Sequence, residues 1–400
     1  TNISDFDKKD NIRRKDGVNW ELLERADNST RLVLFYTGLA FIIIISAAGY
    51  FTLRKPISFT LDPGEAWISF ILILITTFIR FNGNRYMIFL QGVNKVAMLR
   101  RWEAIISVLS IISGFFVAIT TRSLLWLIVN QQVWAIIQLL FNRYLCRIIL
   151  DGRFREFRPA GFDRELFNAI FPAAWKSWVG VLMSYGVVQA SGLAVAQMGN
   201  NPSVTAYLFS LKILDILKNF SNAPFYSKIP LYNRLFIEGN RQGLMARVTF
   251  GMRFSLLTFV VTAVIVGLAG QPLLNFIGSN VTMVPAGIWI AMVTAYFFER
   301  YGALHLQLYS ISNNIVWHIA NGVSGLIFIG LSFLFILVFR WGIISFPLAL
   351  IVSSIAFFDW YSAGKSYRYF NLRFRDFEYR TSFFPLIIMI VYVFLSLVML

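Results

Sequence analysis

Long, mostly apolar runs with few charged residues recur along the whole chain and constrain its fold more than any other feature. With 57% hydrophobic and 14% charged residues, the 400-residue chain lacks the charge needed to solvate a globular surface. A membrane helix needs about 20 residues to cross the hydrocarbon core. Eleven runs have roughly this length: residues 32–53, 65–90, 103–121, 123–145, 167–196, 203–225, 252–270, 284–310, 315–339, 342–361 and 382–400. The sequence therefore predicts an all-α polytopic membrane protein, since a β-barrel would show short alternating segments instead.

Basic residues are concentrated in alternate connections between these runs. The formal net charge is +16, and Lys and Arg cluster before residue 32 and around residues 80–101, 143–164, 228–253 and 365–380. The connections in between carry almost no charge, as at residues 197–202 and 271–283. The positive-inside rule places the basic connections in the cytoplasm and gives all eleven spans a consistent path. A basic patch for RNA is the alternative, but the alternation argues for a membrane and against a nucleic-acid partner.

Three segments return about 220 residues later, in the same order, which predicts a duplicated module of membrane helices. Residues 153–157 return as residues 373–377 with only Glu156 replaced, by Asp376. The other matches are Arg80-Phe81 with Arg300-Tyr301, Asn94 with Asn314, and Arg25 and Arg31 with Arg247 and Arg253, while His305 stands where Arg85 would be expected.

The repeat divides the chain into two pseudo-symmetric six-helix bundles, of which the first lacks about two helices at its start. Residues 1–150 form the N-terminal lobe, with four helices after a cytoplasmic loop, and residues 151–165 form a linker. Residues 166–362 form the six-helix C-terminal lobe, and residues 363–400 a cytoplasmic loop and one extra membrane helix. Parallel repeats of this kind leave a cavity between the two bundles.

Charged residues inside the apolar run at 203–225, together with one in the preceding run, are the main candidates for a binding site. Lys212, Asp215 and Lys218 lie three residues apart on one helical face, and Lys176 lies in the run at 167–196. Each such charge costs about 2.5–3.5 kcal/mol on insertion scales and is rarely kept without a function. An unpaired lysine at this depth would suit an anionic ligand. The alternative is an ion pair of Asp215 with Lys212 or Lys218, together with Lys218 reaching back to the interface.

Two further groups of polar residues are candidate contacts. Asn130, Gln131 and Trp134 lie in the run at 123–145 and suit sugar hydroxyls and the flat face of a pyranose, although hydrogen bonds between helices are an equally good explanation. Arg80 and Arg300 occupy equivalent repeat positions and would form a basic cytoplasmic entrance, unless both side chains simply reach back to the interface.

Several chemistries are disfavoured by what the sequence contains. Cys146 is the only cysteine and His305 and His318 are the only histidines, so we expect neither a disulfide within the chain nor a metal site rich in these residues. No catalytic triad or phosphate-binding glycine loop occurs at a meaningful spacing. Short outer connections leave little room for catalytic groups. We therefore expect a transporter rather than an enzyme, with no cofactor.

Two passages resemble a known family: residues 91–103, from Gln91-Gly92-Val93-Asn94-Lys95 to Arg100-Arg101-Trp102-Glu103, and residues 206–230, from Ala206-Tyr207-Leu208-Phe209 to Pro224 and Pro230. In these, the chain is similar to oligosaccharide-lipid flippases of O-antigen and exopolysaccharide units, in the multidrug/oligosaccharidyl-lipid/polysaccharide exporter superfamily. The resemblance implies a MATE-like fold of two six-helix lobes around a cationic cavity, alternating access, and a polyprenyl-pyrophosphate-linked oligosaccharide as cargo.

The resemblance also implies a place and partners for the chain. It indicates polysaccharide biosynthesis at the bacterial cytoplasmic (inner) membrane. The implied partners are membrane lipids, a coupling ion, either H⁺ or Na⁺, and polysaccharide polymerase machinery. We expect Lys176, Lys212 and Lys218 to neutralise the pyrophosphate, and Asp215 to orient or release a lysine.

Two rival functions stay open at this point. A multidrug or cation antiporter of the same superfamily would need carboxylates in the cavity, and only Asp215 lies deep enough in the sequence pattern. A membrane-embedded glycan polymerase would need catalytic groups in outer connections, which are short here.

Overall fold

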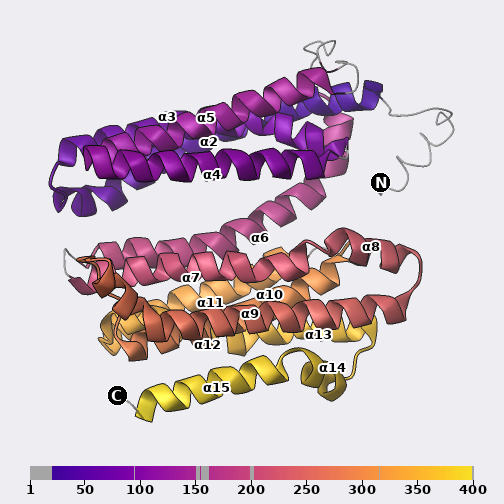
Figure 1. The fold of residues 1–400 in the computed structure, drawn as a ribbon. Helices are drawn as coiled ribbons and strands as arrows, with labels where there is room; N and C mark the ends of the chain where they lie inside the picture. The colour runs from indigo at the N-terminus through magenta and orange to yellow at the C-terminus, as the bar shows by residue number, and fades with distance from the viewer. Residues whose placement is uncertain are drawn as a thin grey trace. The chain divides into compact units, whose positions relative to one another are not determined.

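The computed structural model of the chain describes residues 20–93, 95–149, 154, 162–198, 202–314 and 316–398. These residues form helices joined by turns, and they include no strand (Figure 1). The chain divides into two compact units, Thr1–Pro172 and Ala173–Leu400. The division falls inside one helix, α6 (Arg164–Ala196). Most of the predicted linker at 151–165 lies outside the described residues, as does Asn94 of the predicted repeat.

The first unit contains four long helices: α2 (Trp20–Ser58), α3 (Pro63–Gly92), α4 (Val96–Thr121) and α5 (Leu124–Ile148). Side chains at the N-termini define where two of them begin. The Asp62 carboxylate accepts a hydrogen bond from the Glu65 amide at 3.0 Å, and Ser123 caps α5 through the Trp126 amide. Within the unit, α3 packs against α2 and α5, and α4 packs against α5.

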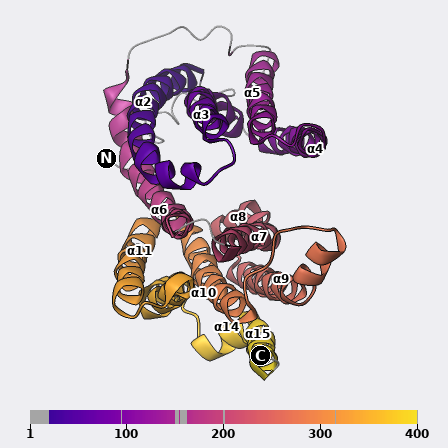
Figure 2. The same cartoon turned by 90° about the vertical axis from the view of Figure 1, so that its left-hand side faces the viewer.

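The second unit begins within α6 and continues with α7 (Pro202–Tyr226), the short α8 (Ile229–Ile237), α9 (Arg241–Phe276), α10 (Ala286–Ser310) and α11 (Trp317–Phe333). Five shorter pieces follow: η2 (Leu334–Val338), η3 (Gly342–Ile344), α12 (Ser345–Ser353), η4 (Ser354–Phe358) and α13 (Asp359–Phe370). The described part ends with α14 (Phe374–Thr381) and α15 (Phe383–Val398). Figure 2 shows α10 in the middle of this unit, where it contacts α7, α9, α12, α13 and α15.

All eleven predicted spans fall on helical segments. Within the described residues, seven stretches are long and apolar enough to cross a membrane: Leu23–Ser58, Pro63–Gly92, Val96–Thr121, Leu124–Ile148, Arg241–Phe276, Trp317–Val338 and Gly342–Phe370. The pair α14 and α15, bent by 60°, brings the number to eight if it counts as one span. Large apolar side chains on these helices are exposed, among them Ile111, Phe115 and Phe116 of α4. This pattern confirms a multi-pass helical membrane protein, because such side chains need lipid rather than water around them.

The region predicted as a cytoplasmic loop after residue 362 is largely helical. Helix α13 continues to Phe370 and ends at Asn371, which adopts the left-handed conformation with φ of 48°. Helix α14 follows after a short turn. The sequence pattern missed α14 because this helix is amphipathic and rich in charged residues of both signs, which is also typical of a solvated loop.

Helix bounds repeat along the chain at about the spacing of the sequence matches. Helices α2 and α3 match α9 and α10 in this spacing, and α4 matches α11 together with η2. Helix α5 matches the whole segment from η3 to α13. The packing order also returns, since α10 contacts α9, α12 and α13 as α3 contacts α2 and α5. Arg122 and Gly342, both with positive φ, stand at matching turns. The MATE-like arrangement of two bundles stays a prediction.

Candidate functional site

An ion pair between α7 and α10 lies inside the second unit. Lys218 Nζ is 2.8 Å from Glu299 Oε1, and each side chain is 14% exposed. The Lys218 ammonium also lies 5.6 Å from the centre of the Tyr296 ring. The charge of Lys218 is therefore neutralised by Glu299 on another helix, and not by Asp215, which lies on the same helix as Lys218.

Asp215 takes part in hydrogen bonds with two neighbouring helices. Its carboxylate accepts a hydrogen bond from Gln189 Nε2 at 3.3 Å and another from the Tyr296 hydroxyl at 3.3 Å. Of the other predicted cations, Lys212 is exposed and Lys176 is half-buried. The ion pairs found among the described residues include none with Lys176 or Lys212. Of the four charged residues predicted for the site, Lys218 and Asp215 thus have partners on other helices. The other two, Lys176 and Lys212, are cations that can meet an outside anion.

Arg300 does not form a basic entrance, and its side chain does not reach back to the interface. It is 1% exposed in the middle of α10. Its guanidinium donates hydrogen bonds to Asn222 Oδ1 of α7 and, at 3.0 Å, to Ser255 Oγ of α9. This placement corrects the prediction, because acceptors from two helices hold the charge inside the unit. Arg80, its counterpart in the repeat, is exposed.

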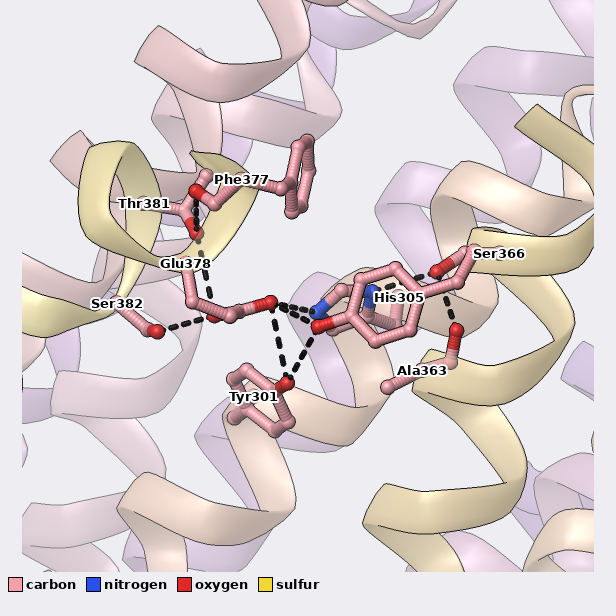
Figure 3. Close-up of polar contacts among 9 residues, drawn as sticks. Tyr301, His305, Ala363, Ser366, Phe377, Glu378, Thr381 and Ser382 are labelled. Atoms are coloured by element: carbon pink, nitrogen blue, oxygen red, sulfur yellow. Dashed lines mark hydrogen bonds and ion pairs between the residues drawn. The ribbon is translucent and has the colours of Figure 1, made fainter. Parts of the chain in front are cut away.

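A second polar network, which the sequence analysis did not find, joins α10, α13 and α14 (Figure 3). Its centre is Glu378, which is 8% exposed. Glu378 Oε1 lies 3.2 Å from Nε2 of the fully buried His305, and it accepts hydrogen bonds from the hydroxyls of Tyr301, at 3.2 Å, and Tyr367. Glu378 Oε2 accepts a hydrogen bond from the Ser382 hydroxyl.

Little in the sequence could have identified this network. Tyr301 and His305 stand more than 70 residues before Glu378, and Glu378 stands in an arginine-rich segment that resembles a solvated connection. The one available signal was His305 in the place of Arg85. A titratable residue that replaces a fixed cation at a repeated position indicates a changed chemical role.

The predicted sugar contacts on α5 are used mainly for packing within the first unit. The Ser113 hydroxyl donates a hydrogen bond to Asn130 Oδ1 at 2.9 Å and accepts one from Trp134 Nε1 at 2.7 Å. Ser113 belongs to α4, so these bonds join two neighbouring helices, which is the alternative explanation given by the sequence. Gln131 is exposed on the same helix.

A cavity of about 600 Å³ lies within the first unit between α2, α3 and α5. Two cations, Arg31 and Arg85, border it together with polar and aromatic side chains, of which Asn28, Tyr36 and Asn82 are examples. Arg85 is 3.6 Å from the Asp27 carboxylate and lies over the Tyr86 ring. The cavity therefore combines a cationic lining with apolar helix surface, which suits a ligand that has an anionic group beside apolar or sugar parts.

No group of three or more His, Cys, Asp or Glu side chains suited to hold a metal ion occurs in the described part of the chain. Comparison with protein-family models, with curated proteins and with solved structures gives no match to this chain.

Proposed function

We propose that the protein is a flippase that moves a polyprenyl-pyrophosphate-linked oligosaccharide across the bacterial cytoplasmic membrane by alternating access, for polysaccharide biosynthesis. Such a carrier must shelter a charged head group and sugars while the lipid tail stays in hydrocarbon. It is not an enzyme in this proposal, and it needs no cofactor.

The observation that carries the proposal is the cationic cavity of the first unit. A pyrophosphate group would gain charge-assisted hydrogen bonds from Arg31 and Arg85, because guanidinium groups match phosphate oxygens in geometry. Asp27 balances only part of this positive charge. Amide and aromatic side chains beside the arginines suit sugar hydroxyls and sugar rings.

Two lysines of the second unit add to the support. Lys212 of the run at 203–225 and Lys176 of the preceding run are the predicted cations that remain able to bind an outside anion, since Lys218 pairs with Glu299. In the proposal these two cations receive the pyrophosphate when it passes the second unit, and Asp215 stays a positioning residue through its bonds to Gln189 and Tyr296.

The multidrug antiporter is the weaker candidate on the same observations. A carrier for cations needs an accessible carboxylate, whereas Glu299 is paired with Lys218 and Asp215 accepts two hydrogen bonds. A cationic dye would therefore meet positive charge at Lys212 and in the cavity of the first unit.

The test is transfer of a fluorescent lipid-linked oligosaccharide across vesicles that contain the purified protein. We expect transfer by the native protein, without any new glycosidic bond, and at least a tenfold loss in Arg85→Ala and Lys212→Ala. Lys212→Arg keeps the charge and should keep most of the transfer.

Lys95→Ala is a matched control, because Lys95 is an exposed lysine at the start of α4. This variant should transfer as the native protein does. Full transfer by both Arg85→Ala and Lys212→Ala would overturn the proposal. Transport of a cationic dye in place of the lipid-linked sugar would support the antiporter, and a lengthened glycan would support a polymerase.

A further inference from the structure

The hydrogen bonds around His305 determine which of its ring nitrogens carries a proton. The Ser366 hydroxyl donates its only hydrogen to the Ala363 carbonyl oxygen at 2.9 Å, within α13. The same hydroxyl oxygen lies 2.7 Å from His305 Nδ1, and with its one hydrogen directed to the Ala363 carbonyl it accepts there. His305 Nδ1 therefore carries a hydrogen, and in a neutral ring Nε2 would be left with a lone pair.

The surroundings of Glu378 favour its ionised form. Tyr367 and Ser382 each donate a hydrogen bond to the carboxylate, and the Tyr301 hydroxyl lies 3.2 Å from Oε1. Hydrogen bonds to a carboxylate stabilise the charged form. A neutral His305 would then leave an unprotonated Nε2, which makes no hydrogen bond, 3.2 Å from an anion in a place where the ring is 0% exposed. A proton between these two atoms turns the contact into an attraction.

We propose that His305 and Glu378 form a proton-binding site, occupied as an imidazolium–carboxylate pair that holds α14 against α10 and α13. Release of one proton takes the pair from net charge zero to −1 and leaves two acceptors facing each other. The other titratable groups that contact His305 are Tyr301 of α10 and Tyr367 of α13, and both face the same carboxylate. Proton release therefore weakens the contact between α14 and the rest of the unit.

The site lies within one unit and involves no cargo, so its test is separate from that of the proposed export. If export is driven by an ion, this site indicates that the ion is H⁺. Loss of the proton site would leave the cationic cavity and its predicted ligand unchanged.

Nitrogen NMR of ¹⁵N-histidine protein in lipid vesicles tests the site directly, because His305 and His318 are the only two histidines. The His318→Gln variant leaves the signals of His305 alone. In this variant we expect both ring nitrogens of His305 to be protonated at neutral pH. In the double variant His318→Gln/Glu378→Gln, we expect Nε2 to lose its proton. A neutral ring at neutral pH in the protein with native Glu378 would overturn the proposal, and this outcome does not depend on the folding of the Glu378 variant.

A spin label on α14 tests the consequence. Tyr379 of α14 is 69% exposed, so the label is attached to the variant Tyr379→Cys. Cys146→Ala in the same chain removes the native cysteine, so that only the new thiol reacts. We expect the label to become more mobile when the pH is raised and the proton leaves. His305→Gln should remove this pH dependence, and His318→Gln should keep it. A label with the same mobility at every pH would contradict the release of α14.

Discussion

A charged side chain among membrane helices is costly, and Arg300 shows how specific acceptors offset that cost. Asn222 and Ser255 come from two different helices, 78 and 45 residues away in the sequence. Arg80 occupies the matching repeat position and remains exposed. The same residue type therefore has two different environments at the two positions that the predicted repeat matches.

Replacement of these two arginines should have unequal effects on stability. Arg300→Ala leaves Asn222 and Ser255 without their donor inside the unit, and we expect a loss of about 2 kcal/mol or more. Arg80→Ala is the matched control and should change stability by about 0.5 kcal/mol at most. Unfolding in mixed micelles measures both. Equal losses would show that the burial of Arg300 has no energetic consequence.

The Lys218–Glu299 pair gives a second test at single residues. Removal of either partner leaves the other charge buried and unpaired, at a cost of about 3–5 kcal/mol. The double variant Lys218→Ala/Glu299→Ala removes both charges, so we expect it to be more stable than either single variant. The same unfolding measurement is used. Simple addition of the two single losses would mean that the pair is not coupled.

The sequence predicted the types of the candidate residues better than their partners. Lys212, Asp215 and Lys218 were identified because a charge in an apolar run is conspicuous. Their partners could not be predicted, because Glu299, Tyr296 and Gln189 stand on other helices at distances set by packing. Glu378 was missed for the same reason, and its basic neighbours in the sequence concealed it.

At the scale of one element, the start of α6 depends on a single side chain. Asp163 Oδ1 accepts a hydrogen bond from the Leu166 amide at 3.0 Å, and Oδ2 lies 2.5 Å from the Arg25 guanidinium. These bonds lower the pKa of Asp163, with the hydrogen bond from the Leu166 amide as the main cause. Asp163 is thus an N-cap with a charged partner.

Asp163→Ala should destabilise the first unit by about 1 kcal/mol at neutral pH. A lowered pKa in the folded state means that the stabilisation is present above the ordinary aspartate pKa of about 3.9 and is lost as pH falls through the folded value. The difference between the native protein and Asp163→Ala should therefore shrink in acid. Asp163→Asn keeps a cap without the charge and should lie between the two. A difference that is constant from neutral to acidic pH would contradict this role.

Helices were the most predictable elements of the fold. Each apolar run gave a helix because a helix satisfies all of its backbone groups within one segment in lipid. Helix ends were less predictable. Helix α2 begins at Trp20, before its apolar run starts, and α13 continues to Phe370, after its apolar run has ended. Both extensions carry charged residues, which hydropathy alone assigns to connections.

For the whole molecule, the alternation of charge predicts that both units have the same orientation in the membrane. Leu61, after α2, and Ile277, after α9, stand at matching connections and are exposed. With Cys146→Ala as background, Leu61→Cys and Ile277→Cys should both react with a membrane-impermeant maleimide in intact cells. Ile237→Cys lies at the end of α8, in a basic connection, and should react only after the membrane is opened. Labelling of Leu61→Cys and Ile277→Cys from opposite sides would contradict parallel units.

Arg85 and His305 occupy matching positions in the two units, and each lies beside a carboxylate. An arginine keeps its charge at any physiological pH, whereas a histidine can give its charge up. If the predicted duplication holds, the two copies have specialised: the first holds a permanent counter-ion for cargo, and the second holds one whose charge is lost when the pH rises.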